Sequence, residues 1–413
     1  MLVQGIALAL QLAAGAGAVG VPRIAGNPDL PPECNASTVR RVPIETGGRL
    51  FEYRYAYRPA DDGGDDQPVV VNIPGGPGEG SIGRPLSVPW EFGIVRIDPL
   101  GAGCNANAAI SADSLTSEDI ASAVLAVVRD IKPKRYILYG VSYGSVVATI
   151  AAAKAREAGV PQPDAVVLEA VLGRAFQPDE ALWAFENGWN DLKSRLPPGA
   201  VDALSQDPPP FGVAPEIWGG YLEYLQLYGA PPGGGTGFAV DSLSALDPAA
   251  PEDKRQVLRN QLNAFAGQHT DAAHAALYRS IVCRELDGSA RGQLTDFALR
   301  GGALIPLDPG FCGPRKMTSA FDAAAYQVEA PLFYFSGGQD PATPEFQTAY
   351  HYVSQRSARK TWVRVPTGGH LSFSGNLMDC QEALWKDIAA DGGARFASIL
   401  SSCLIRPSPS LAP

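Results

Sequence analysis

The stretch that decides the fold runs from Tyr136 to Ile150 and reads YILYGVSYGSVVATI. Its first four residues predict a buried strand, the next five a sharp turn, and the rest a helix. Ser142 stands at the apex of the turn, with Gly140 and Gly144 where so tight a turn has room only for small residues. The helix that follows directs its first N–H groups toward the serine, where negative charge would develop. The segment therefore predicts a nucleophilic serine.

The surrounding elements alternate in the way that a covered parallel sheet requires. Strands are expected over residues 39–58 (an edge pair), 69–73, 92–97, 165–168, 332–335 and 361–365, and helices over 116–130, 344–356 and 379–400. Strands that alternate with helices indicate an α/β fold whose mostly parallel sheet is flanked by helices. The alternation stops between residues 176 and 322, where helical segments are separated by runs of proline and glycine. We expect a mostly helical cap at 176–325, inserted between core segments 21–175 and 326–406.

The composition narrows the possible partners. The chain has 413 residues, of which 46% are hydrophobic and 18% charged, with a formal net charge of −10. This suits a globular protein with a sizeable core. The negative charge disfavours nucleic acid and anionic membranes as partners. The sequence does not indicate an oligomeric state.

The first twenty residues resemble a secretory signal. Residues 2–19 are apolar and contain small-residue motifs of the kind found at cleavage sites, although no Lys or Arg precedes the apolar run. We expect a secreted or periplasmic protein, or a cytoplasmic one if residues 1–20 form an ordinary helix. No other apolar stretch is long enough to span a membrane, so stable membrane insertion is not expected.

Six cysteines support export. An even number in a chain with a possible signal indicates disulfides, and 15 connectivities are possible. Proximity along the chain favours Cys34–Cys104, Cys283–Cys312 and Cys380–Cys403. The alternative is six reduced, buried thiols in a cytosolic enzyme. No two cysteines have the spacing of a zinc site, so no metal is expected.

A nucleophilic serine needs a base, and the chain offers four histidines. His269 and His274 fall in the expected cap, and His351 lies inside an expected helix. His370 follows a strand in a glycine-rich loop, which makes it the preferred general base.

The carboxylate that orients the base should follow another strand. Asp340 comes directly after the strand at 332–335 and 30 residues before His370, which leaves room for one helix and one strand. Asp98 is the rival, but it precedes the serine, and a turn-forming role explains it equally well.

An oxyanion hole needs two preorganised N–H donors. The amide of Tyr143, directly after the serine, is one candidate, and the amide of Gly76 in the loop 74–78 is the other. This glycine loop lacks the lysine of a phosphate-binding loop and the glycine spacing of a dinucleotide site. No organic cofactor is expected.

Together these motifs resemble the α/β-hydrolase superfamily, and within it the proline iminopeptidases and secreted tripeptidyl aminopeptidases. The matching segments are 72–78 (NIPGGPG), 139–144 (YGVSYG), 338–344 (GQDPATP), 368–370 (GGH), the opening 41–44 (RVPI) and Cys380. The resemblance implies an α/β-hydrolase fold with an inserted cap, an acyl-enzyme mechanism, and cap carboxylates that hold the substrate's α-amine.

One departure concerns substrate orientation. The family's Asp-Gln-Arg-Gly segment is replaced here by residues 98–103, DPLGAG, and its arginine is missing. Glu79 and Glu186 are candidates for the amine-binding carboxylate. Trp183 and Trp189 could line a hydrophobic substrate pocket, although packing within the cap explains them equally well.

The sequence thus predicts a serine hydrolase that releases amino acids or short peptides from the N-termini of peptide substrates. An esterase or lipase acting on small or polymeric esters is the alternative. A hydrolase fold kept as a binding protein is a third possibility, which the complete set of catalytic residue types disfavours.

Overall fold

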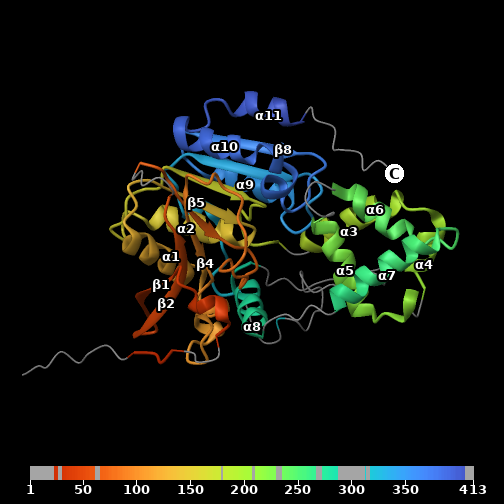
Figure 1. The fold of residues 1–413 in the computed structure, drawn as a ribbon, viewed down its shortest axis with the longest axis horizontal. Helices are drawn as coiled ribbons and strands as arrows, with labels where there is room; N and C mark the ends of the chain where they lie inside the picture. The colour runs from red at the N-terminus through yellow and green to blue at the C-terminus, as the bar shows by residue number, and fades with distance from the viewer. Residues whose placement is uncertain are drawn as a thin grey trace, which may run out of the picture.

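The computed structural model describes residues 23–26, 30–60, 66–177, 180–206, 210–228, 235–266, 272–286, 312 and 317–404. Its centre is an eight-stranded sheet in the order β1-β2-β4-β3-β5-β6-β7-β8 (Figure 1). The strands are β1 (Val39–Thr46), β2 (Arg49–Arg58), β3 (Val69–Ile73), β4 (Gly93–Ile97), β5 (Tyr136–Val141), β6 (Ala165–Glu169), β7 (Leu332–Gly337) and β8 (Lys360–Val365). β2 is antiparallel to β1 and β4, and the strands from β4 to β8 are parallel to one another.

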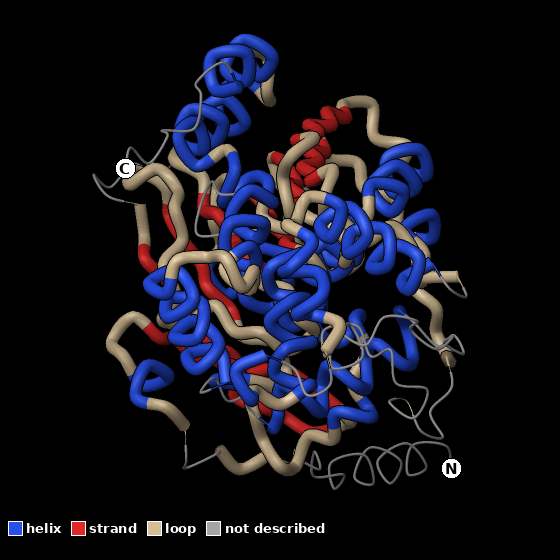
Figure 2. Tube along the Cα trace, turned by 90° about the vertical axis from the view of Figure 1, so that its right-hand side faces the viewer, coloured by secondary structure: helices blue, strands red, loops and turns tan. Residues whose placement is uncertain are grey.

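Helices cover both faces of this sheet, and the alternation of side chains along each strand divides the core accordingly. In β5, Tyr136 and Leu138 pack in the cluster that contains α1 (Ser117–Ile131) and α2 (Tyr143–Lys154). Ile137 and Tyr139 point to the other face, which is covered by α10 (Met378–Asp391) and α11 (Phe396–Leu404). Figure 2 shows helices on both sides of the strands. The predicted α/β-hydrolase fold class is confirmed by this arrangement.

Local sequence signals explain where α1 begins and where α10 ends. Thr116 caps α1: its side chain accepts the N–H of Asp119, and the Asp119 carboxylate accepts the N–H of Thr116. One helix was expected over 379–400, but the structure has a break between α10 and α11. Gly392 and Gly393 adopt φ values of 58° and 84° there, a left-handed conformation that ends a helix.

The insertion between β6 and β7 is helical in the part that the structure describes. It comprises α3 (Glu180–Ser194), α4 (Pro198–Leu204), α5 (Pro215–Tyr228), α6 (Gly235–Ser244), α7 (Glu252–Ala266) and α8 (Ala272–Ile281). α3 to α7 lie to one side of the sheet (Figure 1) and share their own apolar cluster. Leu277 and Ile281 of α8 instead pack in the core of the sheet. The division into separate core and cap domains therefore stays a prediction.

The six cysteines pair as predicted. The Cα atoms are 5.2 Å apart in Cys34–Cys104, 5.5 Å in Cys283–Cys312 and 6.0 Å in Cys380–Cys403. The predicted signal at residues 1–20 lies outside the described residues. Among the helices that are described, none is both long and apolar enough to cross a membrane.

Candidate active site

Ser142 lies between β5 and α2, in a backbone conformation that few residues adopt. Its φ is 56° and its ψ is −125°. Gly140 and Gly144 flank it where side chains have no space. A Cβ at Gly140 would collide with the carbonyl of Gly144 and lie 2.8 Å from the Cβ of Ala148, and a Cβ at Gly144 would collide with the carbonyl of Ile73. These close contacts show why only small residues fit at both positions, as the sequence predicted.

The glycine loop after β3 lies against this turn. A Cβ at Gly75 would be 3.0 Å from the Cβ of Ser142, and Gly76 has a φ of 108° that suits only glycine. Tyr143 begins α2, and its buried hydroxyl lies 2.9 Å from the hydroxyl of Ser117. The roles of the Gly76 and Tyr143 amides as oxyanion donors stay predictions.

Asp340 and His370 are in contact, as their spacing predicted. Asp340 follows β7 and His370 follows β8, and the His370 Nδ1 atom is 2.8 Å from Asp340 Oδ2. Both side chains are buried. Asp340 Oδ1 accepts the N–H groups of Ala342 and Thr343 at 2.9 and 3.2 Å, and the Thr343 hydroxyl donates to Oδ2. The carboxylate is therefore held in one orientation.

The contact between Asp340 and His370 favours the charged form of each group: it lowers the pKa of Asp340 and raises that of His370. Burial opposes ionisation of each group, but the His370 charge and hydrogen bonds outweigh it and lower the pKa of Asp340. Burial likewise opposes protonation of His370, whereas the carboxylate of Asp340 raises its pKa, with further contributions from Glu169 and Glu79. The imidazole of His370 is therefore a stronger base than a histidine in water.

The three predicted catalytic residues follow the carboxyl ends of strands in one sheet. Ser142 follows β5, Asp340 follows β7 and His370 follows β8, and the carboxyl ends of parallel strands meet at the same edge. The assignment of Ser142 as the nucleophile served by the Asp340–His370 pair stays a prediction.

The rival carboxylate, Asp98, has a structural role. Its Oδ1 atom accepts the N–H groups of Ser81 and Ile82 at 2.7 and 3.0 Å, and Oδ2 accepts that of Cys104 at 2.8 Å. Burial raises its pKa, against the effect of these hydrogen bonds. Asp98 thus joins the segment at Ser81 and Ile82 to the segment at Cys104.

Two of the other histidines are placed by the structure, and His269 lies outside the described residues. His351 is buried in α9 (Glu345–Ser354), where its ring nitrogens lie 2.9 Å from the Thr149 hydroxyl and 3.0 Å from the Tyr334 hydroxyl. Burial lowers its pKa to about 3. His274 of α8 lies against the glycine loop, since a Cβ at Gly78 would be 3.1 Å from its carbonyl oxygen.

One residue of the site was missed by the sequence analysis. Glu169 ends β6 and is fully buried. Its carbonyl accepts the N–H of Ser142 at 2.8 Å. Its Oε1 atom accepts the N–H groups of Phe373 and Ser374 at 2.7 and 2.9 Å, and its Oε2 atom accepts the hydroxyl of Tyr139. Glu169 therefore joins the serine turn to the segment after His370. A carboxylate in an otherwise apolar strand was the only available signal.

The predicted substrate-binding residues lie in different environments. Glu79 is partly exposed and faces Arg84, with 3.6 Å between charged atoms. On α3, Glu186 is half-buried and the side chain of Trp183 is 58% exposed, whereas Trp189 is buried in the α3–α7 cluster. Packing therefore accounts for Trp189. The substrate roles of Glu79, Glu186 and Trp183 stay predictions.

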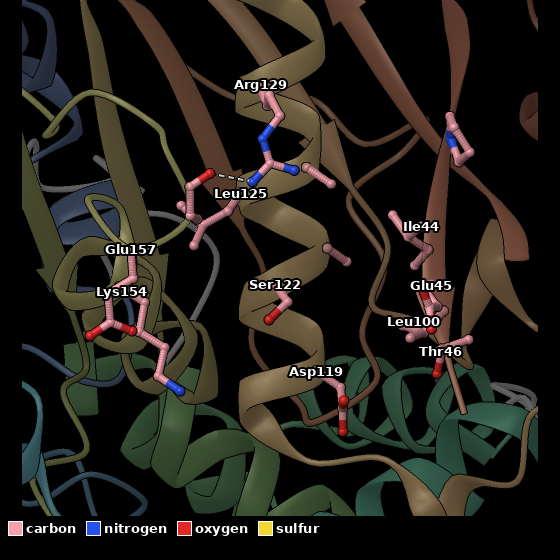
Figure 3. A pocket seen from close by; sticks show the side chains of 14 residues that line it. Ile44, Glu45, Thr46, Leu100, Asp119, Ser122, Leu125, Arg129, Lys154 and Glu157 are labelled. Carbon is pink, nitrogen blue, oxygen red and sulfur yellow. Dashed lines mark hydrogen bonds between the residues drawn. The ribbon is translucent and has the colours of Figure 1, made fainter. Parts of the chain in front are cut away.

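Trp183 lines a cavity of about 450 Å³ between the helical insertion and the loop after β7. Asp340 forms part of the same wall, so the cavity adjoins the candidate site. Another cavity, of about 460 Å³, lies between β1, α1 and the end of α2 (Figure 3). Both of its basic groups already have partners: Arg129 donates to the carbonyl of Ala158, and Lys154 pairs with Glu118 at 2.6 Å. No predicted site residue lines that second cavity.

No protein-family model and no curated protein matches this chain. The chain is similar in structure to Rv0554 from Mycobacterium tuberculosis (14% identity, TM-score 0.47, 85% of this chain and 99% of that one). It is also similar to a proline iminopeptidase from Mycobacterium smegmatis (15%, 0.45, 89% and 99%) and to an esterase from Thermogutta terrifontis (15%, 0.40, 84% and 97%). Because these similarities are distant, the fold assignment rests on the strand order and the flanking helices described above.

Proposed function

We propose that the protein is a serine hydrolase that releases amino acids or short peptides from the N-termini of peptide substrates. The observation that carries this proposal is the buried contact of 2.8 Å between Asp340 and His370. A carboxylate that orients an imidazole and raises its pKa is what a serine nucleophile requires. The strained turn that carries Ser142, with glycines packed against it, supports the same chemistry.

In the proposed reaction, the Ser142 hydroxyl attacks the scissile carbonyl while His370 accepts the hydroxyl proton. Asp340 holds the imidazole in the required tautomer and stabilises its cation. The amides of Tyr143 and Gly76 donate to the oxyanion of the tetrahedral intermediate, and His370 then protonates the leaving amine. Water, activated by the same imidazole, hydrolyses the acyl-enzyme and regenerates Ser142.

One feature favours the second candidate function, ester hydrolysis. Leu100 stands where the resembled peptidases carry an arginine, and its side chain is buried in the core. A substrate-orienting cation is therefore missing from this position. Assays in parallel on aminoacyl and tripeptidyl amides and on short acyl esters separate the two functions. Efficient ester turnover without amide turnover would overturn the peptidase proposal.

A fluorophosphonate probe tests the mechanism itself. We expect it to label Ser142, and we expect Ser142→Ala to lower kcat by about 10³-fold or more. Ser122→Ala on the exposed side of α1 is the matched control and should retain full activity. Absence of labelling in the folded wild-type protein would instead favour a binding protein on a hydrolase fold.

We further propose that the protein acts outside the cytoplasm. The three disulfides support this proposal, because such bonds persist in oxidising compartments. Mass spectrometry of the exported protein, expected to begin near residue 20, is the corresponding test.

A further inference from the structure

The cavity beside Asp340 combines an apolar wall with an unusual polar group. Trp183 of α3, Leu225 of α5 and Phe346 of α9 contribute apolar surface. The rings of Trp183 and Phe346 have centroids 6.4 Å apart. Gln226 of α5 lies in the same lining and is only 5% exposed.

Gln226 is buried without hydrogen-bond partners. Neither its Nε2 nor its Oε1 atom bonds to any group in the described structure, and Oε1 of Gln339, another lining residue, is in the same state. The neighbouring position on α3 is Gly188, and a Cβ there would lie 3.0 Å from Gln226 Oε1 and 3.6 Å from the Cβ of Pro341. The lack of a side chain at this position keeps space open beside the Gln226 oxygen.

An unpaired buried amide is costly. Each polar group left without a partner destabilises the protein by about 1–3 kcal/mol. Water that enters the cavity can pair with Gln226 in the free protein, and a ligand that replaces this water must offer both an acceptor and a donor. A peptide group offers both, because it carries a C=O and an N–H, whereas an ester offers only acceptors.

The cavity is connected to the candidate catalytic loop by direct hydrogen bonds. The carbonyl of Leu227, the residue after Gln226, accepts the N–H of His370 at 2.7 Å. The N–H of Gln339 donates to the carbonyl of Gly368 at 3.0 Å. A ligand in this cavity would therefore lie next to the loop that carries the proposed general base.

We propose that this cavity is a substrate subsite in which the side chain of Gln226 pairs with a main-chain peptide group. An apolar side chain of the same substrate would pack against Trp183 and Phe346. The inference rests on the proposed function and deepens it, because the subsite would favour peptides over esters of similar shape.

Binding to the Ser142→Ala protein tests the subsite without requiring turnover. The probes are a tripeptide amide of two alanines and a phenylalanine, and its analogues in which one main-chain N–H is replaced by an ester oxygen. By calorimetry, we expect one of these analogues to bind about 10-fold more weakly than the tripeptide amide, as the loss of one buried hydrogen bond predicts. In the same background, Gln226→Met should weaken the tripeptide amide about 10-fold and abolish the difference between the probes.

Two further variants complete the test. Gln381→Met in α10 is the matched control, because Gln381 is also buried with both amide atoms unpaired but does not line the cavity, and it should leave binding unchanged. Gly188→Ala keeps the Gln226 amide and places a methyl group against its oxygen, so it should weaken binding even if Gln226→Met fails to fold.

The subsite is overturned if every ester analogue binds as tightly as the amide, or if Gln381→Met is as harmful as Gln226→Met. The outcome is separate from that of the proposed function. Selective peptide binding without any hydrolysis by the wild-type protein would refute the peptidase and leave the subsite. Peptide hydrolysis that is indifferent to Gln226 would refute the subsite and leave the peptidase.

Discussion

The positions next to Ser142 show how strongly a single residue can be determined by its surroundings. Gly144 is the second residue of helix α2 and lies against the end of β3, from which the glycine loop departs. A Cβ at this position would collide with the carbonyl of Ile73 and lie 2.8 Å from that of Pro74. The close approach of two backbone segments explains the glycine directly, and it also fixes the distance between the serine turn and the loop that carries Gly76.

Gly144→Ala should therefore impair activity more than stability. The added methyl group has to push the glycine loop away from the serine turn, and a shift of about 1 Å in such a site can cost about 10²-fold in rate. We expect kcat/KM to fall by about that factor on whichever substrate the protein accepts, with a loss of about 1–3 kcal/mol in the free energy of unfolding. Gly26→Ala is the control, since nothing lies within 4 Å of a Cβ there. Full activity of Gly144→Ala would show that the two segments need not be in contact.

The end of strand β6 connects the turn that carries Ser142 to the segment that follows His370. The backbone of Glu169 holds the N–H of Ser142, and its carboxylate holds two N–H groups that lie more than 200 residues later in the chain, at Phe373 and Ser374. The carboxylate accepts four donors, namely these two N–H groups and the hydroxyls of Tyr139 and Ser374. They offset part of the cost of its burial, which still raises the pKa of Glu169. Glu169 is therefore a positioning residue, which acts through the segments that it joins.

Glu169→Gln should shift the pH dependence of activity. The reaction requires neutral His370, so kcat/KM rises with pH through the pKa of this histidine, which the charges of Asp340, Glu169 and Glu79 raise above its usual value. Removal of the Glu169 charge lowers this pKa, and the midpoint of the rise moves to lower pH. Glu329→Gln removes an exposed carboxylate that pairs with Arg156, so it should leave the midpoint in place. A midpoint that is the same in Glu169→Gln and in the wild-type protein would contradict this account.

Helix α9 carries a second pH-dependent element. His351 is neutral and buried between Thr149 and Tyr334, and its pKa of about 3 lies below that of a histidine in the unfolded chain, about 6.5. The unfolded state binds the extra proton first, so stability is lost as pH falls below about 6.5. Urea denaturation should show a loss of about 2 kcal/mol from this residue between pH 7 and pH 5. His351→Gln should lower stability at pH 7 and flatten this dependence. An unchanged slope would contradict the assignment of a neutral, buried imidazole.

The sequence alone could predict those features of the molecule that short, contiguous motifs determine. The turn at Ser142, the spacing of Asp340 and His370 and the alternation of strands and helices all depend on short segments whose chemistry is local. Glu169 and Gln226 could not be found in this way. Their roles arise from contacts with distant segments, Glu169 with residues 373–374 and Gln226 with the cavity beside the loop after β7.

The same distinction applies to the helices. The pair Gly392-Gly393 was a visible stop signal between α10 and α11, although a single helix was predicted across it. The position of α8 carried no such signal. Leu277 and Ile281 suit a cap interior as well as the sheet core, and only the tertiary structure shows that they pack with the sheet.

The disulfides act on the molecule as a whole, and their loop lengths predict an order of importance. Cys34–Cys104 closes a loop of 70 residues and Cys380–Cys403 one of 23. Loop-closure entropy in the unfolded chain then assigns about 4 kcal/mol to the first bond and about 3 kcal/mol to the second. We expect the Cys34→Ala/Cys104→Ala protein to be less stable than the Cys380→Ala/Cys403→Ala protein by about 1 kcal/mol in urea denaturation. If the second protein proved the less stable, the contacts between α10 and α11, rather than the entropy of the unfolded chain, would determine the effect of these bonds.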